Sequence, residues 1–367
     1  MTARMKTRAC VFCGASPDKK TIEHVLPRWL IRATGDPKEP VPLGVDRKTG
    51  KARFFPFDKL VLPSCQECNQ RFGELENQAR DVVFRVFDRA ILSEHEVNVL
   101  MDWLDKVRIG LWLWQLSMDG PGNDFRPKFR IDSRLAAKDR LVFVLPLQND
   151  LRGLGFYGTN TMAFLRSPSC FALAANNTAF LNVSFDYFLS NRLGFPYLQD
   201  WYALGADKPE FGLLQRGTGK VRPPMMPGRL RGQGVAFGQC IFDPQTDERA
   251  GTDYYSDGHL LGALSEITGR SVIFAGHEDT VEKLSELDHD LLHPDMPIAN
   301  RITYKPWLIL EVYKIQSDII NLWPKSEWVD EEMRANVERY KEEALSELTP
   351  QIRALDIVHA KLGGLVV

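Results

Sequence analysis

Four of the chain's six cysteines stand in two Cys-x-x-Cys pairs, Cys10 with Cys13 and Cys65 with Cys68. Two such pairs can be brought together to hold one tetrahedral zinc ion through four thiolates. In a chain of the cytoplasm, paired motifs of this kind indicate a metal site rather than disulfides. The 51 residues between Cys13 and Cys65 exceed a simple zinc ribbon, so we expect an inserted segment. The pattern predicts a structural zinc site.

The inserted segment holds a second group of residues that could do chemistry. It reads Thr-Ile-Glu-His-Val-Leu-Pro-Arg-Trp-Leu over residues 21–30, and the second cysteine pair continues directly into Asn69. In order and spacing, the two stretches resemble the HNH endonuclease superfamily, specifically its zinc-stapled branch with a Glu-His-Val-x-Pro strand and a Cys-x-x-Cys-Asn helix start. The resemblance covers roughly residues 8–78, about a fifth of the chain.

That resemblance implies a ββα-metal fold, in which two strands and a helix hold one divalent cation, Mg²⁺ or Mn²⁺. It implies that His24 is the general base and that Glu23 and Asn69 are ligands of the cation. The chemistry is consistent, because a neutral imidazole can take a proton from water near neutral pH. A hard cation with oxygen ligands can polarise a scissile phosphate. Asn69 would bind through its amide oxygen, which makes a weak site that keeps several waters.

One position departs from the family's pattern. The middle asparagine, which orients the base, should lie near the second strand, which we expect at Phe57-Asp58-Lys59-Leu60. No asparagine stands there, and Asp58 is the nearest substitute. Two functions therefore stay open. The first is a metal-dependent endonuclease that hydrolyses DNA, for which the resemblance implies microbial restriction or anti-phage defence. The second is an inactive, zinc-stabilised protein that binds nucleic acid or serves as a scaffold.

Charge is distributed unevenly along the chain. The formal net charge is −2, but residues 1–80 contain fifteen Lys/Arg and nine Asp/Glu, whereas the other 287 residues contain 31 and 39. A basic segment on an acidic body indicates a polyanionic partner. Within this segment we expect Arg28, Arg32 and Arg71 to contact the phosphates of DNA.

A second basic stretch lies further along, where no acidic residue occurs between Phe211 and Phe242. Glycine and proline are scattered through it, so it could be either a loop that lies on phosphates or an ordinary solvated loop. Its candidate nucleic-acid-binding residues are Arg216, Lys220, Arg222, Arg229 and Arg231.

Two helices are expected after the second cysteine pair. The first begins near Cys65 and keeps apolar residues at i, i+4 and i+7 spacing from Leu75 to Ala90. The second is expected over residues 93–118, because Ser93 is followed three residues later by Glu96, the pattern of a capping box. A stretch rich in glycine and proline then follows, over residues 118–127.

Taken together, the elements predict an α+β protein. We expect a zinc-stapled ββα-metal module over residues 1–92, made before Cys65 of short extended pieces and loops. Residues 93–367 are expected to form a larger region, strand-rich over 128–300 and helical over 305–362, with a break at Pro350. This region could bind a protein partner or an activator.

The remaining composition is ordinary, with 44% hydrophobic and 26% charged residues. No apolar run approaches the roughly 18–20 residues that a membrane span needs, and no apolar stretch of a signal peptide follows the basic N-terminus. We therefore expect a cytoplasmic protein.

Cys170 and Cys240 stand in apolar surroundings and are expected to be buried like small hydrophobic residues. Cleavage of both DNA strands by a single-site nuclease would favour a homodimer.

Overall fold

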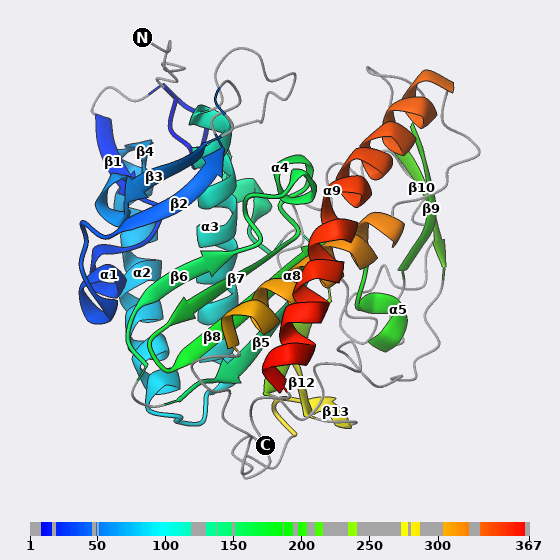
Figure 1. Ribbon diagram of the computed structural model, residues 1–367. Coiled ribbons are helices and arrows are strands. Elements are labelled where there is room, and N and C mark those ends of the chain that lie inside the picture. Colours follow the sequence, from blue (N-terminus) through cyan, green and yellow to red (C-terminus); the bar gives the residue numbers. More distant parts are fainter. Residues whose placement is uncertain are drawn as a thin grey trace.

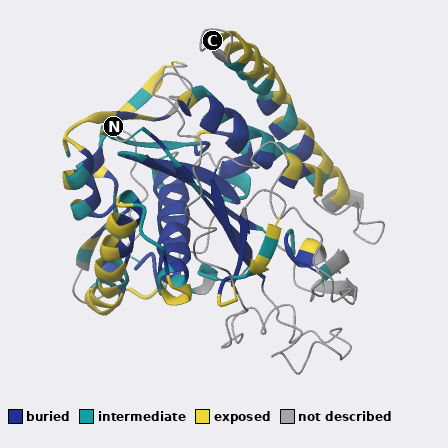
Figure 2. Cartoon of the chain, turned by 90° about the horizontal axis from the view of Figure 1, so that it is seen from below, coloured by how far each residue is buried: buried dark blue, intermediate teal, exposed yellow. Residues whose placement is uncertain are grey.

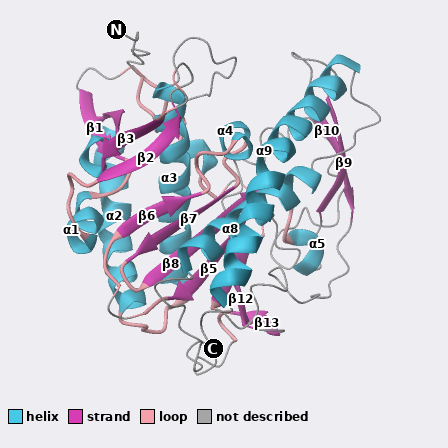
Figure 3. Cartoon of the chain, in the orientation of Figure 1, coloured by secondary structure: helices cyan, strands magenta, loops and turns pink. Residues whose placement is uncertain are grey.

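Three layers make up the molecule in the computed structural model, with helices on both faces of an antiparallel sheet (Figures 1 and 3). A smaller group of strands lies beside the helical layer at the N-terminal end. The residues that the structure describes are 9–16, 20–45, 49, 51–118, 130–136, 138–148, 151–185, 187–193, 197–203, 210–215, 234–240, 273–277, 280–286, 304–322 and 331–363. The mixture of helices and strands confirms the expected α+β class.

The N-terminal part contains two antiparallel strand pairs and one short helix. Strand β1 pairs with β4, with His24 opposite Val61, and β2 pairs with β3. The chain then passes from β4 directly into a long helix. The bounds are β1 Lys20–His24, α1 Arg28–Thr34, β2 Pro40–Val45, β3 Ala52–Pro56, β4 Val61–Cys65 and α2 Gln66–Phe87.

Two expectations for this part were wrong. Helix α1 was not foreseen, because seven residues behind Pro27 are too few to show a helical period in the sequence. The strand expected at residues 57–60 is instead a 3₁₀ turn at Phe57–Lys59, and the strand that pairs with β1 begins only at Val61. Pro56 fixes the extended backbone that leads into this turn, where φ is −63°. Asp58 therefore lies in the turn before β4.

Helix α3, Glu94–Met118, follows α2 and packs against it. Its first turn has the expected capping box: the Ser93 amide donates to Glu96 Oε2 at 2.7 Å, and the Glu96 amide donates to Ser93 Oγ at 3.3 Å. One hydrophobic cluster includes residues of α2, α3 and the large sheet, so the apolar core continues across residue 92.

The large sheet has seven strands in the order β13-β12-β11-β5-β8-β7-β6, all paired antiparallel. Alternate residues of its central strands face opposite helices, as the period of two requires. In β8, Phe180 packs in the cluster that contains α3, whereas Ala179 and Leu181 pack in the cluster that contains α8. The bounds are β5 Asp139–Pro146, β6 Leu154–Tyr157, β7 Cys170–Ala175, β8 Thr178–Phe185, β11 Val235–Gln239, β12 Ile273–His277 and β13 Thr280–Lys283.

Smaller elements connect these strands, and the chain ends in two long helices (Figure 1). These elements are η3 Asp132–Arg134, α4 Met162–Arg166, α5 Ser190–Leu193, β9 Tyr197–Ala203, β10 Glu210–Gln215, α8 Tyr304–Leu322 and α9 Glu331–Gly363. The expected break at Pro350 was wrong, because α9 runs through this proline as one helix. A proline inside a helix costs about 3 kcal/mol through a lost hydrogen bond and a steric clash, and the packing of α9 along α8 offsets this cost.

Among the described residues, no helix is both long and apolar enough to cross a membrane. Cys170 and Cys240 are buried, as expected, at 0% and 3% exposure.

Figure 2 shows the buried residues gathered at the centre of the molecule and exposed ones along the last helix.

Buried charges join α3 to the sheet. Asp105 is fully buried and accepts from Arg108 Nη2 at 2.9 Å and from Asn182 Nδ2 at 3.4 Å. Arg140 of β5 approaches the same carboxylate at 3.7 Å and binds Asp102 at 2.6 Å. These contacts hold α3 on the sheet.

We expect Asp105→Ala to lower the free energy of unfolding by about 3 kcal/mol, because it leaves buried guanidinium groups without one of their counter-charges. Chemical denaturation measures the change. The control is Asp356→Ala, which removes an exposed pair with Lys314 of α8 (2.8 Å) and should cost less than about 1 kcal/mol. Equal losses in the two variants would contradict the assignment of the α3 network as a major support of the fold.

Candidate functional site

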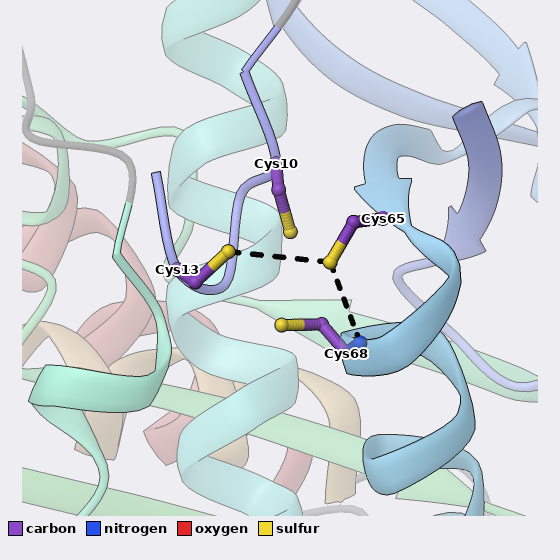
Figure 4. A group of neighbouring side chains, drawn as sticks. All are labelled: Cys10, Cys13, Cys65 and Cys68. Carbon is purple, nitrogen blue, oxygen red and sulfur yellow. Dashed lines mark hydrogen bonds between the residues drawn. The ribbon is translucent and has the colours of Figure 1, made fainter. Parts of the chain in front are cut away.

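The four cysteines of the two pairs come together at one point (Figure 4). Their sulfur atoms all lie within 4.8 Å of one another, and Cys13 Sγ is 4.0 Å from Cys65 Sγ. Sulfurs around a tetrahedral zinc, each bonded at about 2.3 Å, lie about 3.8 Å apart. None of the four is in a disulfide. The cluster therefore has the composition and the spacing to hold a metal ion such as zinc, as the sequence predicted.

Two tight turns present these sulfurs. Gly14, at φ 78°, allows the chain to turn after Cys13, and its amide donates to the Cys10 carbonyl at 2.8 Å. The second turn is the start of α2, where the Cys68 amide donates to Cys65 Sγ at 3.4 Å. The Val11 amide donates to the Pro63 carbonyl at 3.0 Å and so ties the first turn to β4.

The thiols of the cluster influence one another. Burial raises the pKa of Cys68 well above its usual value, and the neighbouring thiols raise it further. Burial also acts on Cys10, but hydrogen bonds from backbone groups outweigh it and lower the pKa of that thiol. Crowded sulfurs of this kind favour a cation, which stabilises the thiolate forms and removes their mutual repulsion.

A cavity of about 770 Å³ lies between β1, α1 and α2. Its lining includes all four residues of the predicted catalytic set. They come from three different parts of the chain: the end of β1, the 3₁₀ turn and the first turn of α2. These four residues are Glu23, His24, Asp58 and Asn69.

His24 is half-buried at the end of β1, and Arg28 of α1 contacts it. Arg28 Nε donates to His24 Nε2 at 3.3 Å, so Nε2 acts as an acceptor and a neutral ring carries its proton on Nδ1. Burial lowers the pKa of His24 below its usual value, the Arg28 guanidinium lowers it further, and Asp58 opposes both effects. These effects together favour the neutral form of the ring.

The oxygens of Asp58 and Asn69 differ in how they are bound. Asp58 Oδ1 is buried and has no hydrogen-bond partner among the described residues. Asn69 Oδ1 accepts from Ser64 Oγ in a long contact of 3.4 Å, and the Ser64 hydroxyl also contacts the Thr21 hydroxyl at 2.7 Å. A buried oxygen without a partner is costly, and a cation or an ordered water would relieve it. Oxygen atoms like these and those of the Glu23 carboxylate are the type of ligand that hard cations prefer.

Glu23 is buried, at 6% exposure, and forms an ion pair that the sequence did not predict. The ammonium of Lys106, from α3, contacts both Glu23 Oε1 and Glu76 Oε1. Burial raises the pKa of Glu23, and the Lys106 charge opposes that shift. Burial alone would lower the pKa of Lys106, but the two carboxylates raise it above its usual value. Both Glu23 and Glu76 line the cavity.

Two sequence signals could have pointed to these residues. Glu76 lies seven residues after Asn69, which places both on one face of a helix. Lys106 stands in the middle of a largely apolar stretch, next to Asp105 and near Asp102 and Arg108, so a partner for its charge was to be expected. The partner could not be read from the sequence, because Glu23 lies 83 residues away.

The predicted phosphate-binding residues divide into three groups. Arg28 and Arg32 line the cavity. Arg71 does not line it; its exposed guanidinium lies over the Phe72 ring at 4.7 Å and 3.9 Å from Asp132. The residues of the second basic stretch, Arg216, Lys220, Arg222, Arg229 and Arg231, lie outside the described residues.

Trp29, which follows Arg28 in α1, packs on Trp103 and Phe84, with ring centroids at 5.8 and 6.1 Å. It therefore anchors α1 to α2 and α3, and it also lines the cavity.

No family model, curated protein or solved structure matches this chain.

We expect the purified protein to carry about one zinc per chain and Cys68→Ser to carry almost none, because a tetrahedral site that loses a thiolate binds zinc far more weakly. Elemental analysis by mass spectrometry measures the metal. Cys170→Ala is the control, since Cys170 lies in the sheet, outside the cluster. A zinc content that does not differ between Cys68→Ser and Cys170→Ala would rule out the four-cysteine site.

Arg28→Gln should raise the pKa of His24, because it removes a positive charge that favours the neutral ring. Titration of the imidazole C2 proton by NMR, without added divalent cations, measures the shift. Arg32→Gln is a matched control, because Arg32 lines the same cavity but does not contribute to the shift. An equal change in both variants would show that Arg28 has no specific effect on His24.

Proposed function

We propose that this protein is a metal-dependent endonuclease of the HNH type that hydrolyses phosphodiester bonds of DNA. The observation that carries the proposal is that Glu23, His24, Asp58 and Asn69 line one cavity. The antiparallel pair β1–β4 followed by α2, with the cysteine cluster at the junction of β4 and α2, is the arrangement expected of a zinc-stapled ββα-metal module.

In this proposal each polar residue has its own role. His24 takes the proton of the attacking water, while Glu23 and Asn69 would hold a divalent cation, Mg²⁺ or Mn²⁺, with their oxygens. When bound, this cation would polarise the scissile phosphate and offset its developing charge. Asp58 takes the place of the family's middle asparagine and orients His24. Its negative charge also stabilises the imidazolium that forms when the proton is taken.

Arg28 links substrate binding to the base. Its guanidinium is exposed and donates to His24 Nε2, the nitrogen whose lone pair would accept the proton of water. A phosphate is a stronger partner for arginine than a neutral imidazole, because both phosphate and guanidinium are charged. Arg28 therefore moves to the DNA backbone when substrate enters and leaves His24 free to accept a proton. Arg32 supplies a further phosphate contact without sequence choice.

The four-cysteine cluster has a structural role in this proposal. A zinc ion held by four thiolates has no open position for substrate. It joins the N-terminal turn to the start of α2 and so fixes Asn69, the residue after Cys68. The larger region, with its seven-stranded sheet, would bind a partner or activator, and a homodimer would allow both strands to be cut. A role in microbial anti-phage defence or restriction fits such an enzyme.

A second candidate function is a zinc-stabilised protein that binds nucleic acid without cutting it. Two contacts favour it: Glu23 is paired with Lys106, and Arg28 contacts the lone-pair nitrogen of His24. Both contacts would keep the catalytic groups bound to other side chains of the same chain.

The test is the nicking of supercoiled plasmid in Mg²⁺ or Mn²⁺. We expect His24→Ala to lower the rate at least ~100-fold, the lower end of what a general base contributes, without loss of DNA affinity. His95→Ala is the control, because His95 is an exposed histidine at the start of α3 that does not line the cavity.

The binding function would be correct instead if the unchanged protein did not nick DNA in either cation. In that case it should still bind the plasmid, with a salt dependence equal to that of His24→Ala.

A further inference from the structure

Neither the resemblance nor the sequence analysis assigned a role to Lys106. It is 2% exposed, and its ammonium contacts Glu23 from β1 and Glu76 from α2. It comes from α3, whereas the proposed nuclease module ends before that helix. A buried lysine beside a proposed cation ligand must affect how that ligand binds a cation.

The effect follows from the charges. Glu23 and Glu76 would together carry −2, and Lys106 reduces the total for the three side chains to −1. The affinity of an oxygen site for a divalent cation increases with the number of anionic ligands. Asn69 adds no charge, and Arg28 and Arg32 add positive charge along the same cavity. Because Lys106 is buried, water and salt screen its charge little.

The contact also occupies a specific atom. Lys106 binds Glu23 Oε1, so this oxygen is shared between the ammonium and any cation that Glu23 holds. A phosphodiester in the cavity would strengthen cation binding, because it brings one negative charge and a non-bridging oxygen that can serve as a further ligand. Its charge would also be attracted by Arg28 and Arg32.

We propose that Lys106 makes cation binding depend on substrate: the site binds Mg²⁺ or Mn²⁺ weakly by itself and firmly when a DNA phosphate lies in the cavity. This inference rests on the proposed function, and it assigns Lys106 as a positioning residue that acts through Glu23. An enzyme built in this way assembles its complete centre only on DNA.

The test measures Mn²⁺ binding directly, from the electron paramagnetic resonance signal of free Mn²⁺. It uses the full-length, zinc-loaded protein with His24→Ala, so that DNA is not cut. A short duplex is present or absent, and Mn²⁺ bound by the duplex alone is subtracted. We expect the duplex to tighten Mn²⁺ binding at least tenfold. In the same His24→Ala protein, Lys106→Met should tighten Mn²⁺ binding at least tenfold in the absence of DNA. It should also abolish most of the further increase in Mn²⁺ affinity that the duplex causes.

Two further variants separate charge from folding. Lys106→Arg keeps the positive charge and should keep the weak affinity. Lys106→Met with Glu76→Gln leaves only Glu23 without its counter-charge, and it should still bind Mn²⁺ more tightly than the parent because Glu23 Oε1 is no longer shared with an ammonium. Thermal unfolding verifies that each variant is folded. A purely structural role for Lys106 would lower the melting temperature and leave the Mn²⁺ affinity of the folded protein unchanged.

The outcomes distinguish the two proposals. If the parent binds Mn²⁺ but the Lys106→Met variants bind it equally or more weakly, the inference about Lys106 is wrong and the nuclease proposal stands. If the parent binds no Mn²⁺ with or without the duplex, the proposed cation site itself is wrong, and the inference fails with it.

Discussion

Helix α3 is buried along most of its length and nevertheless carries four ionisable side chains in its middle: Asp102, Asp105, Lys106 and Arg108. An unpaired charge in such a position would cost several kcal/mol, so each must find a partner of opposite charge or a set of hydrogen bonds. The partners belong to different elements of the molecule. Asp102 and Asp105 bind groups of the sheet, whereas Lys106 binds the two glutamates of the cavity. This requirement fixes the position of α3 between the two parts of the molecule.

The position of the site follows from this helix and from the cysteine cluster. The cluster joins the N-terminal turn to the start of α2, and α2 packs along α3. Glu23 at the end of β1 is then held by Lys106, while Asn69 is held by its place in the first turn of α2. The cavity therefore depends on the larger region as well as on the N-terminal segment, and its chemistry cannot be ascribed to residues 1–92 alone. The apolar core, which is continuous across residue 92, supports the same conclusion.

Local signals in the sequence predicted those parts of the structure that depend on neighbouring residues. The Cys-x-x-Cys spacing predicted the cluster, and Ser93 with Glu96 predicted the start of α3, because turns and caps are made within a few residues. Helix α1 was too short to show a period, and the turn at Asp58 depends on Pro56 and on pairing with distant β1. The Glu23–Lys106–Glu76 contact could not be predicted, because it joins three elements whose approach is set by the packing of the core. Glu23, His24, Asp58 and Asn69 were predicted from motifs; Glu76 of the same cavity and the contacts with Lys106 were not.

The central claim is that Glu23, Asn69 and His24 surround a catalytic cation. Anomalous X-ray scattering from crystals of the zinc-loaded protein grown with DNA and Mn²⁺ tests it most directly. We expect a manganese peak in the cavity, within about 2.0–2.6 Å of a Glu23 oxygen and of Asn69 Oδ1, with His24 beside it. A cavity with DNA bound but without this peak, with Glu23 held only by Lys106, would contradict the claim and favour a protein that binds nucleic acid without cutting it.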